Sequence, residues 1–379
     1  MGLAWGLRMK AMIVFGTRPE AIKMAPVIKA FRADGRFETV VCVTGQHRSM
    51  LDQVLQAFNI VPDIDLNIMQ TGQTLTDVTV NVLEGLGKVL ADTKPDFVLV
   101  HGDTTTAMAA SLAAFYQRIP VGHVEAGLRT RDIWRPWPEE MNRCIIDVSA
   151  KWLFAPTEGA RNALIEEAIP DERIVVTGNT VIDALLMASE LIKSDPIAEE
   201  AFRNKFSFLN PNKKLVLVTG HRRENFGDGL RRMCEALASL ASKGDIQVVY
   251  PVHLNENVQR AAKETLAGVS DVFLIDPQDY LPFVYLMGRS HIIVTDSGGI
   301  QEEAPALGKP VLVTRDVTER PEAIAAGAAR LVGTDPCRIV TEARRLIDIP
   351  EEYKRASSAT NPYGDGRAAH RILETIANA

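Results

Sequence analysis

HIIVTDSGGIQEEAPALGKPVLVTRDVTERPE, residues 291–322, predicts the fold more clearly than any other part of the chain. Its apolar residues 292–295 are typical of a buried strand, and they end in the turn Asp296-Ser297-Gly298-Gly299. A helical segment carrying Glu303 follows, and residues 310–314 predict a second strand. Strand, glycine turn, helix and strand make a βαβ unit, and its turn directs free backbone N–H groups beyond the strand end.

That turn suits a phosphate group. Gly298 and Gly299 let an anion approach the backbone closely, and the dipole of the following helix favours its negative charge. Glu303, one turn into the helix, is placed to accept hydrogen bonds from a ribose diol. A glycine turn between two core elements is also common in α/β proteins, so this segment alone leaves both interpretations open.

Composition describes an ordinary soluble globular protein. The chain has 379 residues, 46% hydrophobic and 24% charged, and its length suggests about two domains. The formal net charge of -6 argues against general nucleic-acid binding, because no basic excess is present to neutralise a phosphate backbone. No apolar run approaches the length of a membrane span. The four cysteines lack metal-ligand spacing, and we expect small buried side chains in a reducing compartment. We therefore expect a cytoplasmic enzyme with an N-terminal extension over residues 1–8.

Strand-like and helix-like segments alternate along nearly the whole chain. Short Val-, Ile- and Leu-rich runs suit strands that are buried on both faces of parallel sheets. The sequence therefore predicts an α/β fold with two doubly wound, Rossmann-like parallel-sheet domains, joined by the polar stretch 193–214. The last segment, 361–379, predicts a short amphipathic helix. The expected strands are 12–15, 39–43, 97–101, 121–124, 152–155 and 174–176 in the first half, and 215–219, 247–251, 272–275, 292–295, 311–314 and 329–332 in the second.

In the first half, charged residues follow the expected strands at their carboxyl ends, where parallel sheets bind ligands. Arg18 and Lys23 lie near a helix start, which is unfavourable for cations unless an anion is held there, so we favour anion binding over two solvated cations. Asp103 is equally suited to a helix N-cap and to a catalytic role. Glu125 occupies no obvious cap, which favours function. Glu139 lies in a Pro-Glu-Glu sequence that a first helical turn explains on structural grounds alone.

The second half offers a second group of candidates. His221 and two arginines follow the strand 215–219 and make a possible phosphate cluster, although a lone histidine is more often structural. Residues 276–283 could present backbone groups and an aromatic face to a base, but spacing alone makes Phe283 an ordinary core residue. Arg320 follows the strand after the glycine turn, again at its carboxyl side.

Several common enzyme signatures are missing. The first βα unit has no G-x-G-x-x-G, and the chain has no G-x-x-x-x-G-K-[ST], which argues against a dinucleotide oxidoreductase and a P-loop enzyme. No G-x-S-x-G elbow appears, and His and Cys do not cluster at zinc spacings. The residues alone predict a two-domain enzyme with cations and a glycine turn for a diphosphate, and with carboxylates for acid–base chemistry.

Seven motifs match one family in the same order. They are GTRPEAIKMAPVI at 16–28, HGDTTT at 101–106, HVEAGLRT at 123–130, WPEEMNR at 137–143, TGHRRENFG at 219–227, PQDYLPFV at 277–284 and DSGGIQEEAPALGKPVLVTRDVTERPEA at 296–323. Through them the chain closely resembles the non-hydrolysing UDP-N-acetylglucosamine 2-epimerases of bacteria, from Met9 to nearly the C-terminus. One such motif would be a weak signal, whereas seven in order are specific.

The resemblance implies an architecture and a reaction. It implies a glycosyltransferase-B-like pair of domains, 9–192 and 193–360, with the active site in the interdomain cleft and the segment 361–379 crossing back to the first domain. It also implies interconversion of UDP-N-acetylglucosamine and UDP-N-acetylmannosamine without NAD or metal, which would supply cell-surface polysaccharide synthesis. We expect elimination of UDP to a 2-acetamidoglucal and its re-addition, because no carbonyl acidifies the C2 proton.

The matching positions also imply roles for residues. Gln278 and Phe283 would hold uracil, and Glu303 the ribose. The acid–base carboxylates would be Asp103, Glu125 and Glu139, assisted by His221, and the phosphate or sugar contacts would be Arg18, Lys23, His221, Ser297, Gly298, Gly299 and Arg320.

Regulation and oligomeric state are implied by the family alone. Its members often use a second UDP-N-acetylglucosamine as an activator near a Gln-His motif, here Gln46 and His47, with His253 nearby. Ser49 departs from the family pattern, which usually has an acidic residue at this position. The family also suggests a homodimer. A glycosyltransferase of the same architecture, a hydrolysing epimerase and a catalytically silent sugar-nucleotide sensor remain alternatives on the sequence.

Overall fold

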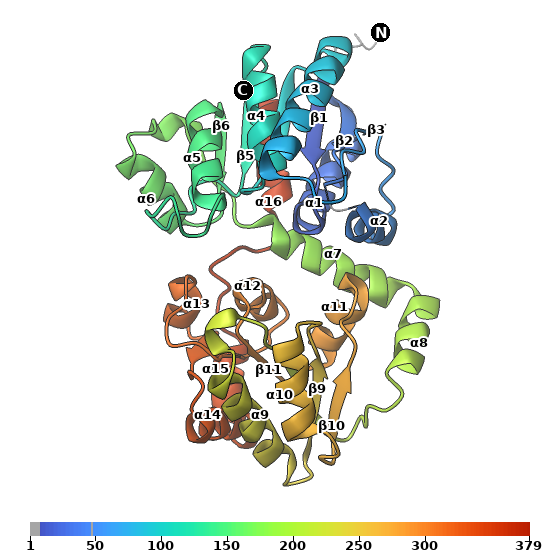
Figure 1. Cartoon of the computed structure of the whole chain (residues 1–379), viewed down its shortest axis with the longest axis vertical. Helices are drawn as coiled ribbons and strands as arrows, with labels where there is room; N and C mark the ends of the chain where they lie inside the picture. The colour runs from blue at the N-terminus through green and yellow to red at the C-terminus, as the bar shows by residue number, and fades with distance from the viewer. Residues whose placement is uncertain (1–7, 47) are drawn as a thin grey trace, which may run out of the picture. The chain divides into compact units, whose positions relative to one another are not determined.

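A computed structural model describes residues 8–46 and 48–379, which form two compact units (Figure 1). Unit 1 comprises the chain up to Ala184 together with Tyr363–Ala379, and unit 2 comprises Leu185–Pro362. The first division therefore falls within helix α7 (Thr180–Ser194). The stretch 193–214, expected to be a linker, contains helix α8 (Pro196–Lys205). Of the expected N-terminal extension, only Arg8 lies within the described residues.

Unit 1 is built on a seven-stranded sheet in the order β3-β2-β1-β4-β5-β6-β7, whose paired strands are all parallel. Its core strands are almost wholly buried, as Val/Ile/Leu-rich strands between two helical layers should be. The strands are β1 (Met9–Phe15), β2 (Phe37–Val43), β3 (Ile64–Asp65), β4 (Phe97–His101), β5 (Val121–Val124), β6 (Trp152–Ala155) and β7 (Ile174–Val176). The helices are α1 (Arg18–Ala33), α2 (Arg48–Ala57), α3 (Leu75–Thr93), α4 (Thr105–Tyr116), α5 (Glu139–Ser149), α6 (Glu158–Glu166), the start of α7, and α16 (Ala368–Ala377).

Unit 2 repeats the plan with a six-stranded parallel sheet in the order β10-β9-β8-β11-β12-β13. The strands are β8 (Lys214–Thr219), β9 (Ile246–Pro251), β10 (Val272–Ile275), β11 (Ile292–Thr295), β12 (Val311–Val313) and β13 (Ala329–Leu331). Besides the rest of α7 and α8, the helices are α9 (Asp228–Ala241), α10 (Glu256–Leu266), α11 (Tyr280–Arg289), α12 (Gly298–Ala306), α13 (Pro321–Ala325), α14 (Pro336–Asp348) and α15 (Pro350–Ser357). The prediction of an α/β fold with two parallel sheets is confirmed, including the βαβ unit β11-α12-β12.

Both sheets contain one point where the strand order reverses. In unit 1 the chain lays down β1, β2 and β3 in one direction and then places β4 on the other side of β1; β8 and β11 stand in the same relation in unit 2. Open parallel sheets bind ligands beyond the carboxyl ends of the strands at such a reversal. The turns after β1, β4, β8 and β11 are therefore where this fold offers binding sites.

The C-terminal segment packs in unit 1, where α16 lies against α1 (Figure 1). Asp183 of α7 caps α16, because its carboxylate accepts hydrogen bonds from the backbone N–H groups of Ala368 (3.2 Å) and Ala369 (2.9 Å). The return of the chain to unit 1 is thus fixed by a side chain as well as by apolar packing.

Some local expectations were wrong. The sequence prediction omitted β3, which is only two residues long and carries no run of apolar residues. Cys42 and Cys234 are buried, but Cys144 is half-buried and Cys337 is exposed, so the expectation of four buried cysteines fails for two of them. No helix in the described part of the chain is long and apolar enough to cross a membrane.

Candidate active site

A pocket of about 410 Å³ in unit 1 lies beside the turns that follow β1 and β4. Its walls include four of the residues singled out in the sequence, Arg18, Gln46, Asp103 and Glu139. They meet because β1 and β4 are neighbours in the sheet and α5 begins at Glu139. His47, the other half of the Gln-His motif, lies outside the described residues.

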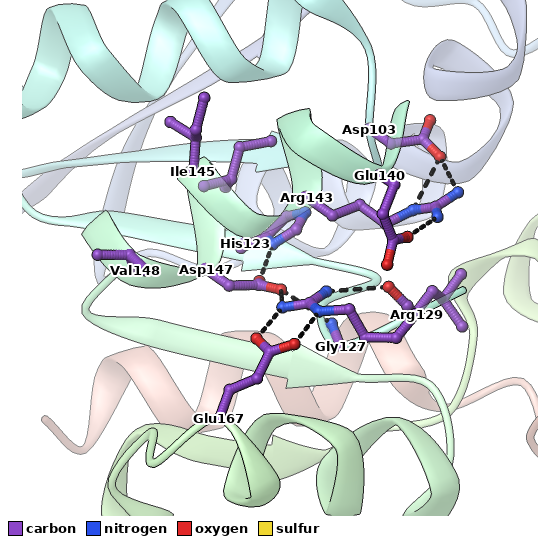
Figure 2. Close-up of polar contacts among 12 residues, drawn as sticks. Asp103, His123, Gly127, Arg129, Glu140, Arg143, Ile145, Asp147, Val148 and Glu167 are labelled. Carbon is purple, nitrogen blue, oxygen red and sulfur yellow. Dashed lines mark hydrogen bonds and ion pairs between the residues drawn. The ribbon is translucent and has the colours of Figure 1, made fainter. Parts of the chain in front are cut away.

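Asp103 is held by Arg143 of α5 (Figure 2). Its Oδ2 accepts hydrogen bonds from Arg143 Nε at 3.1 Å and Nη2 at 2.5 Å, while Arg143 Nη1 donates to Glu140 Oε2 at 2.8 Å. Thr104, not Asp103, is the N-cap of α4, because its hydroxyl accepts the backbone N–H of Ala107 at 3.0 Å. The N-cap alternative for Asp103 is therefore wrong, and its carboxylate is exposed to the pocket.

Glu125 adopts a backbone conformation that is rare for residues other than glycine. Its φ is +70°, in the left-handed region, which for a non-glycine residue indicates a local constraint and is frequent at functional sites. Its Oε2 accepts hydrogen bonds from Lys23 Nζ at 2.5 Å and Asn179 Nδ2 at 2.7 Å, and its Oε1 lies 3.8 Å from His101 Nε2. Burial lowers the pKa of His101 to about 3, so this imidazole is uncharged. Lys23, expected at a phosphate, is thus engaged with a carboxylate.

Glu139 differs from the other two carboxylates. It is the first residue of α5 and half-buried, and its Oε2 is buried without a hydrogen-bond partner in the described chain. Asp103 and Glu125 each have a cation partner, whereas none lies within ion-pair distance of Glu139 among residues 8–46 and 48–379. The carboxyl groups of Asp103, Glu125 and Glu139 therefore have distinct environments.

Sequence reasoning missed Glu20, which ties the turns after β1 and β4 together. Its Oε2 accepts the backbone N–H groups of Gly16 (3.1 Å) and Thr17 (2.8 Å), and its Oε1 lies 2.7 Å from Thr104 Oγ1. Burial raises the pKa of this carboxyl to about 7, against the opposing effect of those hydrogen bonds. The Thr-x-x-Glu spacing of a capping box was the signal in the sequence that could have identified it.

In unit 2, Asp296 organises the turn after β8. This residue is 1% exposed, and its Oδ2 accepts the backbone N–H groups of His221 and Arg222, each at 2.8 Å. The His221 ring stacks on His253 with centroids 5.2 Å apart, and burial lowers the pKa of His221. Asp296, which the sequence analysis treated only as part of the turn, therefore joins the His221 turn to the glycine turn.

The glycine turn lies at the start of α12, beside a cation. Ser297 is the N-cap of α12, but its side chain makes no cap hydrogen bond. A Cβ added to Gly298 would lie 3.7 Å from Arg222 Nη2, which shows that this guanidinium stands beside the turn. Backbone N–H groups, a helix N-terminus and a cation suit a diphosphate.

The remaining candidates of unit 2 lie on neighbouring elements. Glu303 of α12 is buried, with the Tyr280 hydroxyl 3.4 Å from its Oε1, and Arg320 forms an ion pair with Glu302. Phe283 is half-buried on α11, so it is not an ordinary core residue. Gln278 donates from Nε2 to the Asp276 carbonyl at 2.6 Å, while its Oε1 has no partner in the described chain.

Comparison with known proteins gives a consistent answer. A family model described as UDP-N-acetylglucosamine 2-epimerase matches residues 29–377. The UDP-N-acetylglucosamine 2-epimerase of Salmonella typhimurium is 60% identical over 369 residues, which are 97% of this chain and 98% of that protein. The crystal structure of the UDP-GlcNAc 2-epimerase from Neisseria meningitidis bound to UDP-GlcNAc has a TM-score of 0.88 and 53% identity, covering 98% of this chain and 100% of that one.

A glycosyltransferase from Rickettsia africae, with a TM-score of 0.64 and 15% identity, is similar in fold alone. The near-complete coverage by the family model and by relatives of much higher identity shows that the chain belongs to the UDP-N-acetylglucosamine 2-epimerase family.

Proposed function

We propose that this chain catalyses the reversible inversion of UDP-N-acetylglucosamine at C2, giving UDP-N-acetylmannosamine without releasing free sugar. The observation that carries the proposal is the set of three carboxylates of unit 1: Asp103 and Glu125 directly after β4 and β5, and Glu139 at the start of α5. Binding a nucleotide would not require them, whereas moving a proton between two faces of a sugar carbon would. The names of the relatives support the same substrate.

UDP is bound, in this proposal, by the turns of unit 2. The diphosphate takes the backbone N–H groups of Gly298 and Gly299 at the start of α12, with the Ser297 side chain, His221 and Arg320 beside it. Gln278 and Phe283 receive uracil, and the buried Glu303 receives the ribose hydroxyls. Arg18 at the pocket of unit 1 contacts phosphate or sugar.

The reaction proceeds by elimination and re-addition. The C1–O bond breaks with its electron pair leaving on UDP, and a carboxylate removes the C2 proton as positive charge develops at C1. The product is a 2-acetamidoglucal with a C1=C2 double bond. UDP then adds back at C1 while a proton arrives on the opposite face of C2, so that atoms and charges balance. The cations and N–H groups around the diphosphate stabilise the leaving UDP.

We propose a separate role for each carboxylate from its environment. Lys23 and Asn179 stabilise the negative charge on Glu125, which suits a base. Glu139 has no cation partner among the described residues, and we assign it to the opposite face of C2. Asp103, which forms an ion pair with Arg143, is assigned to stabilise positive charge at C1.

A second UDP-N-acetylglucosamine serves as an activator in this proposal. Gln46 lines the same pocket as Asp103 and Glu139, and its Oε1 accepts a hydrogen bond from Thr106 at 2.8 Å. The stack of His253 on His221 would let a ligand at His253 affect a residue at the diphosphate. His47 is included only through the family pattern.

We further propose a cytoplasmic homodimer that supplies UDP-N-acetylmannosamine for cell-surface polysaccharide. Neighbouring helices α3, α4 and α5 expose apolar side chains, with Val80 44%, Phe115 57%, Tyr116 71% and Val148 71% exposed. Exposed aromatic and aliphatic groups on one set of helices suit a contact between copies of the chain.

Product analysis tests the reaction type. The chain is incubated with UDP-N-acetylglucosamine alone, without NAD or added metal, and the products are separated by anion exchange and identified by proton NMR. An equilibrium mixture of the two UDP-sugars supports the proposal. Free N-acetylmannosamine with equal UDP would mean a hydrolysing epimerase, UDP release only with an added acceptor would mean a transferase, and binding without change would mean a sensor.

A further inference from the structure

We infer that His123, held as an imidazolium ion by Asp147, is a positioning residue that fixes the turn carrying Asp103. The inference rests on the proposed function, because it assigns to a buried ion pair the task of aligning one of the proposed catalytic carboxylates. His123 itself lies beneath the turn and is fully buried.

His123 of β5 contacts two other parts of unit 1, and Figure 2 shows its contact with Asp147 of α5. Its Nδ1 lies 2.5 Å from Asp147 Oδ1 on α5, and its Nε2 lies 2.7 Å from the carbonyl oxygen of Gly102. That carbonyl belongs to the peptide bond between Gly102 and Asp103. The imidazole of His123 therefore holds the backbone carbonyl of the residue that directly precedes Asp103.

Both ring nitrogens of His123 must carry protons in this arrangement. The Gly102 carbonyl can only accept a hydrogen bond, so Nε2 has to donate. Asp147 forms an ion pair with Arg129, whose Nη2 donates to Oδ2 at 2.7 Å, and this permanent cation stabilises the charged form of the carboxyl independently of His123. Asp147 is thus a carboxylate, which also accepts. A neutral His123 ring would place a nitrogen lone pair against either Asp147 Oδ1 or the Gly102 carbonyl oxygen, which is repulsive.

The charge on this buried ring is balanced by a chain of ion pairs. Asp147 Oδ2 accepts from Arg129 Nη2 at 2.7 Å, and Arg129 Nε donates to Glu167 Oε1 at 2.7 Å. The chain alternates His⁺, Asp⁻, Arg⁺ and Glu⁻ and reaches solvent at Glu167, whose side chain is 33% exposed. Such a chain is costly to bury unless every member is paired, and it has few alternative geometries.

The result is that Asp103 is fixed from both sides. Gly102, with φ of +68°, turns the backbone sharply at the end of β4, and His123 holds its carbonyl. The Asp103 carbonyl accepts from Asn142 Nδ2 at 2.8 Å. Asp147 also accepts the backbone N–H of Gly127 at 3.3 Å, in the turn that follows Glu125. Asp147 thus contacts both His123, which holds the turn of Asp103, and Gly127, which lies in the turn after Glu125.

The test is a double-mutant cycle in the full-length chain. His123→Gln should lower kcat for the epimerisation of UDP-N-acetylglucosamine by roughly 10- to 100-fold, with KM nearly unchanged, because a small misplacement of a catalytic group has that effect. In an Asp103→Asn background the same substitution should lower the remaining kcat by less than about threefold, since its target is already disabled. His291→Gln is the matched control: it also removes a histidine that contacts a carbonyl oxygen (Leu346, 3.3 Å), but in unit 2. It should leave kcat unchanged.

Each outcome bears on the inference. A fully active H123Q chain, or losses that multiply in the Asp103→Asn background, would overturn it, because a merely structural role gives independent effects. If H123Q does not fold, Asp147→Asn takes its place: it keeps the acceptor for Nδ1 but removes the charge that holds the second proton, and kcat should fall by a smaller factor in the Asp103→Asn background than in the wild-type chain, with the remainder attributed to the turn after Glu125. A wild-type chain without epimerase activity would overturn the proposed function, which the cycle distinguishes from failure of this inference alone.

Discussion

Replacing Glu20 by glutamine should stabilise the protein above neutral pH and have little effect in acid. Glu20 is 1% exposed, and burial raises the pKa of its carboxyl to about 7, from an ordinary value of 4.5. Its hydrogen bonds to Gly16, Thr17 and Thr104 and the N-terminus of α1 favour the charged form instead. Glutamine mimics the protonated acid and cannot ionise. The substitution therefore tests whether burial, which favours the protonated form of Glu20, outweighs the hydrogen bonds that favour the charged form.

The sign and size follow from proton linkage. Below about pH 4.5 the carboxyl is protonated in both the folded and the unfolded chain. As pH rises from 4.5 toward 7, the unfolded chain loses its proton while the folded chain keeps it, so the free energy of unfolding falls. Between about pH 5 and pH 8 the wild-type chain should lose roughly 2–3 kcal/mol through this group, at about 1.4 kcal/mol for each pH unit. The Glu20→Gln variant has no carboxyl group at this position, so its free energy of unfolding should not fall in this way.

Thermal unfolding followed by circular dichroism at both pH values measures the effect. The Tm difference between Glu20→Gln and wild type should increase by about 5–10 °C from pH 5 to pH 8, given roughly 2–4 °C per kcal/mol for domains of this size. Glu158→Gln is the control, because Glu158 also opens a helix but its side chain is 71% exposed. A variant less stable than wild type at both pH values, by an amount that grows with pH, would show that Glu20 is ionised in the fold and would contradict its raised pKa.

Three further predictions concern catalysis, backbone strain and assembly. Asp103→Asn, Glu125→Gln and Glu139→Gln should each lower kcat by at least about 100-fold, as for lost acid–base catalysts; steady-state rates near wild type for all three would refute the assignment. Gly127→Ala should lower the free energy of unfolding by more than about 2 kcal/mol in urea titrations. The cause is a φ of +84° and an added Cβ only 2.4 Å from the Ala160 carbonyl, whereas Gly87→Ala, with nothing within 4 Å, should not destabilise. Tyr116→Glu should give a monomer in sedimentation velocity, and an unchanged sedimentation coefficient would exclude this surface from the proposed dimer contact.

The fold could be predicted because its signals are local. The apolar runs before Gly16, Asp103, His221 and Asp296 each mark a buried strand, and the polar residues that follow mark its carboxyl end. The sequence could not show that β4 returns to the side of β1, since strand order depends on packing between distant segments. The two-residue β3 was missed because it depends on pairing with β2, with no apolar run of its own.

The site was harder to predict because its contacts are long-range. Lys23 and Glu125 are 102 residues apart, and their pairing has no trace in residue spacing. The left-handed backbone of Glu125 is invisible in sequence, because it is imposed by the turn that follows β5. The sequence suits Asp103 equally to a helix N-cap and to a catalytic role. The N-cap role is excluded only by the structure, in which Thr104 is the N-cap of α4. Asp296 was read as part of a turn, whereas its carboxylate reaches 75 residues back to His221.

Proton NMR in deuterated water measures the exchange of the C2 hydrogen that the proposed epimerisation requires. UDP-N-acetylglucosamine is incubated with the wild-type chain, without NAD or added metal, and both the products and their C2 positions are monitored. If a carboxylate removes the C2 proton and solvent-derived hydrogen returns on the opposite face, UDP-N-acetylmannosamine should grow in carrying deuterium at C2, with no accumulation of free sugar. UDP-N-acetylmannosamine that keeps protium at C2, or a spectrum without any epimer, would contradict the account.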